Sequence, residues 1–93
     1  MDERRKTSRV NISFPVKCTV LPERRSNFCT VTKDLSPSGL KILCEGFIPV
    51  GKILKVHVNL LNETLAAKAQ VVWCNRRRHA YGYYAGLHFL EIN

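Results

Sequence analysis

Alternation of apolar and polar residues is the feature that most limits what this chain can fold into. Between residues 10 and 20 every second side chain is apolar, and most of the intervening ones are polar. A period of two turns one face of a β-strand to a core and the other to solvent, whereas a helix needs a period of about 3.6. The alternation recurs in later segments and no segment shows a convincing helical period. The sequence therefore predicts an all-β protein.

Six strands are predicted, separated by segments rich in glycine, proline, asparagine and charged residues. They cover residues 10–20, 28–33, 40–44, 54–60, 65–73 and 81–90. The fifth of these segments contains good helix formers, but its alternation favours a strand. Residues 34–39 are predicted to form a turn on the basis of their composition, and residues 75–80 a basic loop.

The chain has 93 residues, which is enough for one compact domain. Six short antiparallel strands in a small domain are expected to close into a barrel, because closure removes exposed strand edges. We predict one domain over residues 1–93, in which a flexible arm at residues 1–9 precedes a six-stranded antiparallel β-barrel at residues 10–90. Little or no C-terminal helix is expected after the last strand.

The charge balance points to an anionic partner. Lys and Arg number 15 and Asp and Glu number 7, for a formal net charge of +8. Nucleic acid, an acidic lipid surface or a phosphorylated small molecule would each fit this excess. No apolar run approaches the ~20 residues of a membrane span, and no apolar segment follows the charged N-terminus as in a signal peptide. We therefore expect a cytoplasmic protein without a membrane span.

The four cysteines are predicted to be small buried hydrophobic residues. Each lies in an apolar, strand-like stretch: Cys18, Cys29, Cys44 and Cys74. No Cys-x-x-Cys pair is present, and structural zinc sites normally draw on one. We expect no metal ion and no cofactor.

Arginines are concentrated ahead of the first predicted strand, at Arg4, Arg5 and Arg9. The planar guanidinium group pairs bidentately with phosphate and stacks on aromatic bases. Taken alone, the cluster also fits a solvated basic terminus.

The predicted turn at residues 34–39 carries the second group of candidates, Asp34, Ser36 and Gly39. An aspartate can accept the N1 and N2 protons of a guanine edge, and a serine hydroxyl can donate or accept a hydrogen bond. A glycine allows a positive φ or a close backbone approach. Taken alone, the segment also fits a side-chain-stabilised turn.

Together, Arg5-x-x-x-Arg9 and Asp34-x-Ser36-x-x-Gly39 resemble the two signature motifs of the PilZ domain family. The β-rich pattern and the closing segment at residues 85–89 fit the same family, so the resemblance covers essentially the whole chain. It implies a barrel of the split type that binds the bacterial second messenger cyclic di-GMP and acts on a downstream protein target.

The resemblance also implies a role for each motif. Arg5 and Arg9 would grip the phosphates and stack on guanine, with Arg4 as a helper. Asp34, Ser36 and Gly39 would contact guanine and shape the ligand surface. Ordering of the arm over the ligand would create a new surface and so transmit the signal.

Trp73 is a further ligand-binding candidate, because its indole could lie beside a base. By parity it shares a face with Leu65 and Val71, which favours packing in the core. Both interpretations stay open. The basic loop at residues 76–79 belongs to neither motif and fits a solvated hairpin tip, with a ligand or a protein partner as alternatives.

The sequence also bears on three other functional classes. An enzyme is not predicted, because the histidines are scattered along the chain (His57, His79, His88) and no nucleophile–base pairing is visible. A basic barrel that binds nucleic acid would use the tyrosines at residues 81–84 beside the basic loop. A PilZ-like module could instead act through a protein partner alone. The intact motifs speak against this last alternative. Oligonucleotide binding that falls steeply with salt, against stoichiometric binding of cyclic di-GMP, distinguishes the nucleic-acid alternative.

Overall fold

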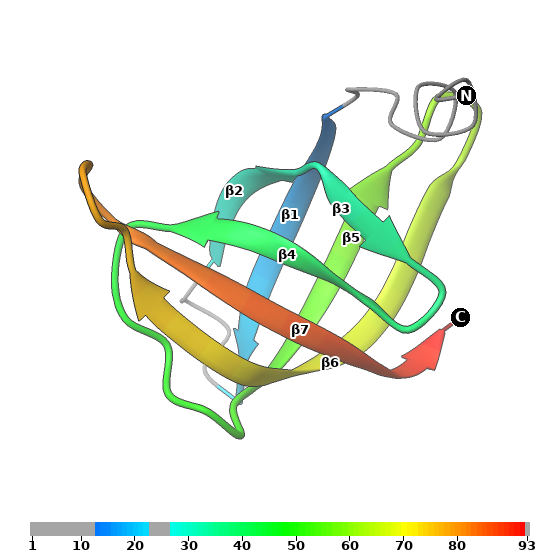
Figure 1. Ribbon diagram of the computed structural model, residues 1–93. Coiled ribbons are helices and arrows are strands. Elements are labelled where there is room, and N and C mark those ends of the chain that lie inside the picture. The colour runs from blue at the N-terminus through cyan, green and yellow to red at the C-terminus, as the bar shows by residue number, and fades with distance from the viewer. Residues whose placement is uncertain (1–12, 23–26, 93) are drawn as a thin grey trace, which may run out of the picture.

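The computed structural model describes residues 13–22 and 27–92, and this part of the chain consists of strands and their connections (Figure 1). Seven strands form one antiparallel sheet in the order β2-β1-β5-β6-β7-β4-β3. Their bounds are β1 Phe14–Leu21, β2 Asn27–Thr32, β3 Asp34–Ser36, β4 Gly39–Cys44, β5 Ile53–Asn59, β6 Thr64–Arg76 and β7 Tyr83–Ile92. Among these residues there is no helix of the length and apolarity needed to cross a membrane.

The sheet curls on itself, so that β2 at one edge approaches β4 near the other (Figure 1). This confirms the predicted all-β, barrel-like fold. The interior is filled by the apolar members of the alternating pairs. Leu54, Val56 and Val58 of β5 have no exposed surface, while Lys55 and His57 between them are exposed. Alternation therefore predicted the inward face of β5 correctly.

The predicted strand at residues 65–73 is confirmed, and the observed strand β6 is longer, from Thr64 to Arg76. Its residues pair with β5 on one side and with β7 on the other. Two ladders satisfy the backbone groups that a helix would have satisfied internally, so tertiary pairing overrides the helix propensity of the alanines.

The segment at residues 34–39 is a hairpin rather than a simple turn. Asp34 lies opposite Lys41 and Ser36 opposite Gly39, which leaves Pro37 and Ser38 between the strands. This hairpin adds the short strand β3 that the sequence analysis missed. A connection of two residues lets both flanks of a turn continue as paired strands.

Two threonine hydroxyls join β2 to β4 where the sheet curls. Thr30 Oγ1 donates to the Leu43 carbonyl oxygen and Thr32 Oγ1 to that of Lys41, both at 2.7 Å. The two strands are thus held together by side chains, without a backbone ladder between them in the described residues. We call this contact the threonine seam.

The expectation that all four cysteines are buried is correct for two of them. Cys18 and Cys44 are buried, Cys74 is half-buried and Cys29 is exposed, and all four are free thiols. Phe28, Thr30 and Thr32 take the less exposed face of β2, so Cys29 faces outward between them. Burial raises the pKa of the Cys18 thiol to about 12 and that of Cys44 to about 11.

Candidate ligand-binding face

The register of four neighbouring strands brings residues that are distant in sequence into one row. Asp34 of β3 lies opposite Lys41 of β4, Lys41 opposite Gly86 of β7, and Gly86 opposite Trp73 of β6. Directly paired residues project from the same side of a sheet. Their neighbours along β4 and β7 are core residues: Leu40, Ile42, Ala85 and Leu87. The row therefore faces outward, and we call it the motif row.

Asp34 stands at the exposed end of the motif row. Its carboxylate lies 3.0 Å from Lys41 Nζ, and its side chain is 62% exposed. Its backbone N–H donates to Thr32 Oγ1 at 3.3 Å, which ties the start of β3 to the threonine seam. An exposed ion pair of this kind contributes about 1 kcal/mol or less, so a ligand can compete for the carboxylate at little cost.

Ser36 organises the hairpin through its hydroxyl. Ser36 Oγ accepts the Ser38 N–H at 3.3 Å and lies 3.1 Å from Ser38 Oγ. It can also donate to the Gly39 carbonyl oxygen at 3.4 Å. The serine is exposed, so it both shapes the turn and leaves oxygen atoms accessible to a ligand.

Gly39 is required because another strand lies too close for a side chain. A Cβ at this position would overlap the Leu87 carbonyl oxygen of β7. The glycines with positive φ are Gly51 and Gly82 among the described residues, so Gly39 is not one of them. A glycine at this position could serve either a positive φ or a close backbone approach. Gly39 serves the close approach of β7.

Trp73 lies on the outer face, and the parity argument that favoured core packing was wrong. The β6–β7 register shifts between Val71 and Trp73, so that these two residues face the adjacent residues Leu87 and Gly86. The extra residue moves Trp73 to the side opposite Val71. Its indole lies against Gly86, where a Cβ would overlap the ring, and the residue is 37% exposed.

A second aromatic residue, Tyr84, extends this face beyond the motif row. Lys41 Nζ lies 5.0 Å from the centre of the Tyr84 ring, and Arg77 Cζ lies 5.2 Å from it. Cations at this distance from an aromatic face are attracted to the ring. Positive charge is thereby held beside Asp34 and Tyr84, on the same outward face as Trp73. This combination suits an anion that carries flat rings.

Lys41 and Gly86 are site residues that the sequence motifs do not predict. The pairing of Asp34 with Lys41 would have followed from a two-residue connection at Pro37 and Ser38. A turn over all of residues 34–39, as predicted from composition, leaves no strand β3 that could pair with β4. No sequence signal located Gly86 beneath Trp73, because their pairing depends on the β-bulge.

The arginine motif, with Arg4, Arg5 and Arg9, lies outside the described residues. The proposed flexibility of residues 1–9 therefore stays a prediction. Within the described residues, no group of three or more His, Cys, Asp or Glu side chains is placed to hold a metal ion.

The chain was compared with known protein families, curated proteins and solved structures. The sequence model described as PilZ domain matches residues 3–93. No curated protein and no solved structure matches the chain.

Proposed function

Because the chain belongs to the PilZ domain family, we propose that it binds cyclic di-GMP and acts as a signalling receptor rather than as an enzyme. Family membership supports this role in general terms. The motif row is the observation that carries the finer assignment, because it joins an accessible carboxylate, a cation and an exposed indole on one outward face. We propose the cytoplasm as the compartment in which the receptor acts.

In this proposal one guanine is read at Asp34. The carboxylate accepts the N1 and N2 protons of the base, and its exposure and weak pairing with Lys41 support access to it. A hydrogen bond that involves a charged group contributes about 1.5–3 kcal/mol, more than the exposed ion pair it would replace.

Trp73 supplies a flat surface for a base. The indole is fixed against Gly86 on one side and is partly open to solvent on the other. Stacking of a base on an aromatic side chain contributes about 1–3 kcal/mol. Ser36 and Gly39 keep the hairpin in shape beside it, Gly39 by allowing the approach of β7.

The phosphates are assigned to the arginine arm. Arg5 and Arg9, with help from Arg4, would pair with the phosphate oxygens and order the arm over the ligand. Lys41 and Arg77 add positive charge to the same face. The ordered arm would present a surface absent from the free protein, which a downstream protein target would recognise.

Isothermal titration of the full chain with cyclic di-GMP tests the proposal. Asp34→Ala should weaken binding about tenfold or more, because it removes a charge-assisted contact to the base. Arg9→Ala should weaken it to a similar extent through loss of a phosphate contact. Glu63→Ala is the matched control, since Glu63 is also exposed but lies in the β5–β6 connection.

Trp73 gives an independent readout, because it is the only tryptophan in the chain. Cyclic di-GMP should change its fluorescence with the stoichiometry found by titration, and that stoichiometry distinguishes one bound molecule from an intercalated pair. The absence of binding heat at micromolar concentrations, or unchanged affinity of Arg9→Ala, would contradict the proposal.

Nucleic acid remains the alternative ligand class, favoured by one observation. Tyr81 is 94% exposed beside a loop with three consecutive arginines at residues 76–78. A nucleic-acid-binding surface would show oligonucleotide affinity that falls steeply with salt, together with no saturable binding of cyclic di-GMP. A module that acts through a protein partner alone would bind neither ligand.

A further inference from the structure

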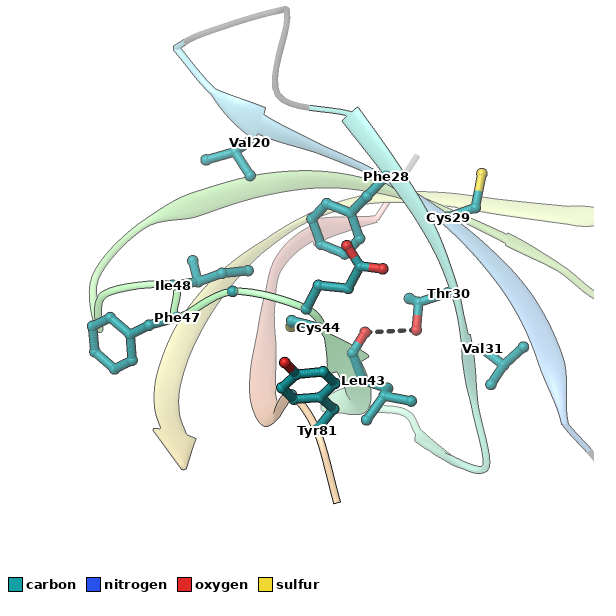
Figure 2. Close-up of a pocket in the computed structure, with 13 residues that line it drawn as sticks. Val20, Phe28, Cys29, Thr30, Val31, Leu43, Cys44, Phe47, Ile48 and Tyr81 are labelled. Atoms are coloured by element: carbon teal, nitrogen blue, oxygen red, sulfur yellow. Dashed lines mark hydrogen bonds between the residues drawn. The ribbon is translucent and has the colours of Figure 1, made fainter. Parts of the chain in front are cut away.

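A groove opens at the Thr30–Leu43 end of the threonine seam. β2 and the end of β4 form its sides, together with the connections at residues 45–48 and 81–82. Figure 2 shows Phe28 and Tyr81 on facing sides of the groove, with the Thr30–Leu43 hydrogen bond at one end of it. Neither sequence motif contributes to this groove.

Strand edges form the sides of the groove. The seam contacts join Thr32 to Lys41 and Thr30 to Leu43, so the next step along the two antiparallel strands brings residue 28 toward residue 45. In the described residues β2 has a ladder partner only in β1, and β4 is paired with β3 only as far as Lys41. Unpaired edges of this kind can accept an added extended segment.

The lining of the groove is mainly apolar and aromatic. Phe28, Ile48 and Leu43 line it, and Phe47 and Tyr81 expose large parts of their rings at its border. Among the described lining residues Glu45 alone carries a charge. Exposed apolar surface gathered in a concave site is typical of a surface that binds a partner.

A guanidinium group is held at the rim. Arg77 Nη1 donates to the Tyr81 carbonyl oxygen at 3.2 Å, and the Arg77 backbone N–H donates to the Gly82 carbonyl oxygen at 3.0 Å. Gly82 has φ of 93°, and a Cβ there would lie 2.7 Å from the Cys44 carbonyl oxygen. Gly82 thus keeps the loop against β4, which fixes Tyr81 and Arg77 beside the groove.

We propose that this groove docks an extended segment of a partner protein, one that presents a bulky apolar side chain next to an acidic residue. The apolar side chain enters between Phe28 and Tyr81, and the acidic residue pairs with Arg77. Charge complementarity to Arg77 selects this occupant, because Arg77 is bonded to the lining residue Tyr81 and belongs to a run of three arginines on a chain of net charge +8. Glu45 is the one acidic residue among the described lining residues, so the acidic residue of the partner is placed at Arg77 and not inside the groove. The same charge opposes a second copy of the chain. The proposal goes beyond cyclic di-GMP binding and does not depend on it.

Selection from a phage-displayed library of random dodecapeptides, with the full chain as target and no cyclic di-GMP, tests this inference. Enriched peptides should combine a bulky apolar residue with a nearby Asp or Glu. Their affinity is then measured by fluorescence anisotropy. Tyr81→Ser should weaken binding roughly tenfold, as expected for an aromatic anchor. Arg77→Gln should weaken it severalfold and reduce its salt dependence.

Matched controls separate the groove from other surfaces. Leu61→Ser removes an exposed apolar residue from the β5–β6 connection, and Arg78→Gln removes a neighbouring charge. Trp73→Ala alters the motif row. All three should bind the selected peptides as the wild type does, and Tyr81→Ser should keep the wild-type melting temperature because its ring is almost wholly exposed.

Several results would overturn the inference. Enrichment of no peptide, or of basic or wholly polar peptides, excludes the proposed partner chemistry. If Arg77→Gln and Arg78→Gln weaken peptide affinity equally, the peptide responds to the general positive charge of the loop and not to the Arg77 guanidinium group at one position. Loss of binding in Trp73→Ala but not in Tyr81→Ser moves the peptide site to the motif row.

Discussion

Gly86 shows how much a single missing side chain contributes to the candidate site. The indole of Trp73 lies where a Cβ of residue 86 would project. The two residues are cross-strand partners, so the glycine creates a seat for the ring on the outer face of the sheet. Trp73 is thereby oriented before any ligand arrives, which reduces the entropy lost on binding.

Gly86→Ala should displace the indole from this seat. We expect the tryptophan fluorescence of the free protein to shift and the affinity for cyclic di-GMP to fall about tenfold, since a stacked base contributes about 1–3 kcal/mol. Fluorescence titration measures both effects. Gly46→Ala is the control, because a Cβ at Gly46 meets no atom within 4 Å. Unchanged fluorescence and affinity in Gly86→Ala would show that the seat has no role.

The buried thiols predict how stability depends on pH. Burial raises the pKa of Cys18 from 9.0 to about 12 and that of Cys44 to about 11. The unfolded chain therefore loses thiol protons at a pH at which the folded chain retains them. The stabilisation is complete below pH 9 and declines as pH rises toward 11 to 12, by up to about 1.4 kcal/mol per pH unit for each thiol.

Urea unfolding at a series of pH values from 8 upward checks this expectation. Cys18→Ala should show a shallower decline in the free energy of unfolding than the wild type. Val56→Ala should follow the wild-type slope, because it truncates a fully buried residue of the same core and keeps both buried thiols. A comparison of slopes avoids the constant cost of the cavity that Cys18→Ala leaves in the core. Identical slopes for both variants would contradict the assignment.

At the scale of elements, the threonine seam connects the edge strand β2 to β4, the strand next to the other edge of the sheet, and supports the hairpin at residues 34–39. Thr32 is 1% exposed, donates to the Lys41 carbonyl oxygen and accepts the Asp34 N–H. One hydroxyl thus holds β2 against β4 and fixes the first residue of β3. The hairpin with Asp34, Ser36 and Gly39, which is proposed to contact the ligand, is therefore positioned by a residue outside it.

Thr32→Val should destabilise the protein by about 1–3 kcal/mol, because it removes the hydroxyl that donates to the Lys41 carbonyl oxygen and accepts the Asp34 N–H from a position that is 1% exposed. It should also weaken cyclic di-GMP binding, since Asp34 loses its anchor. Chemical denaturation and titration measure the two effects. Thr64→Val is the matched control on an exposed position of β6. If both variants were equally stable, the seam would be unnecessary for the fold.

At the scale of the whole molecule, curling of the sheet separates two surfaces with different chemistry. The motif row lies on the outer face of β3, β4, β7 and β6, and the groove lies where β2 and β4 diverge. β4 contributes to both, through Lys41 in the row and Leu43 at the groove. The net charge of +8 is a common background that would attract both the proposed anionic ligand and the proposed acidic partner.

Much of the fold could be predicted from the sequence because burial follows alternation. The inward residues of β5 and the strand character of β6 were predicted from that pattern. The shorter elements were harder to predict. β3 has three residues, too few for a periodic signal, and it exists because β4 is available to pair with it. Similarly, Tyr81 was expected in the last strand, but β7 begins only at Tyr83.

The sequence by itself determined the all-β fold, the alternating core and the presence of both PilZ motifs. These depend on residue type and local spacing, which a linear pattern contains. Only the tertiary structure decided that Asp34, Lys41, Gly86 and Trp73 form one row and that Trp73 faces outward. Cross-strand register and a single β-bulge set these relations. One extra residue in a strand turns every later side chain to the opposite face of the sheet. The motif row and the outward position of Trp73 therefore arise only when the strands pair.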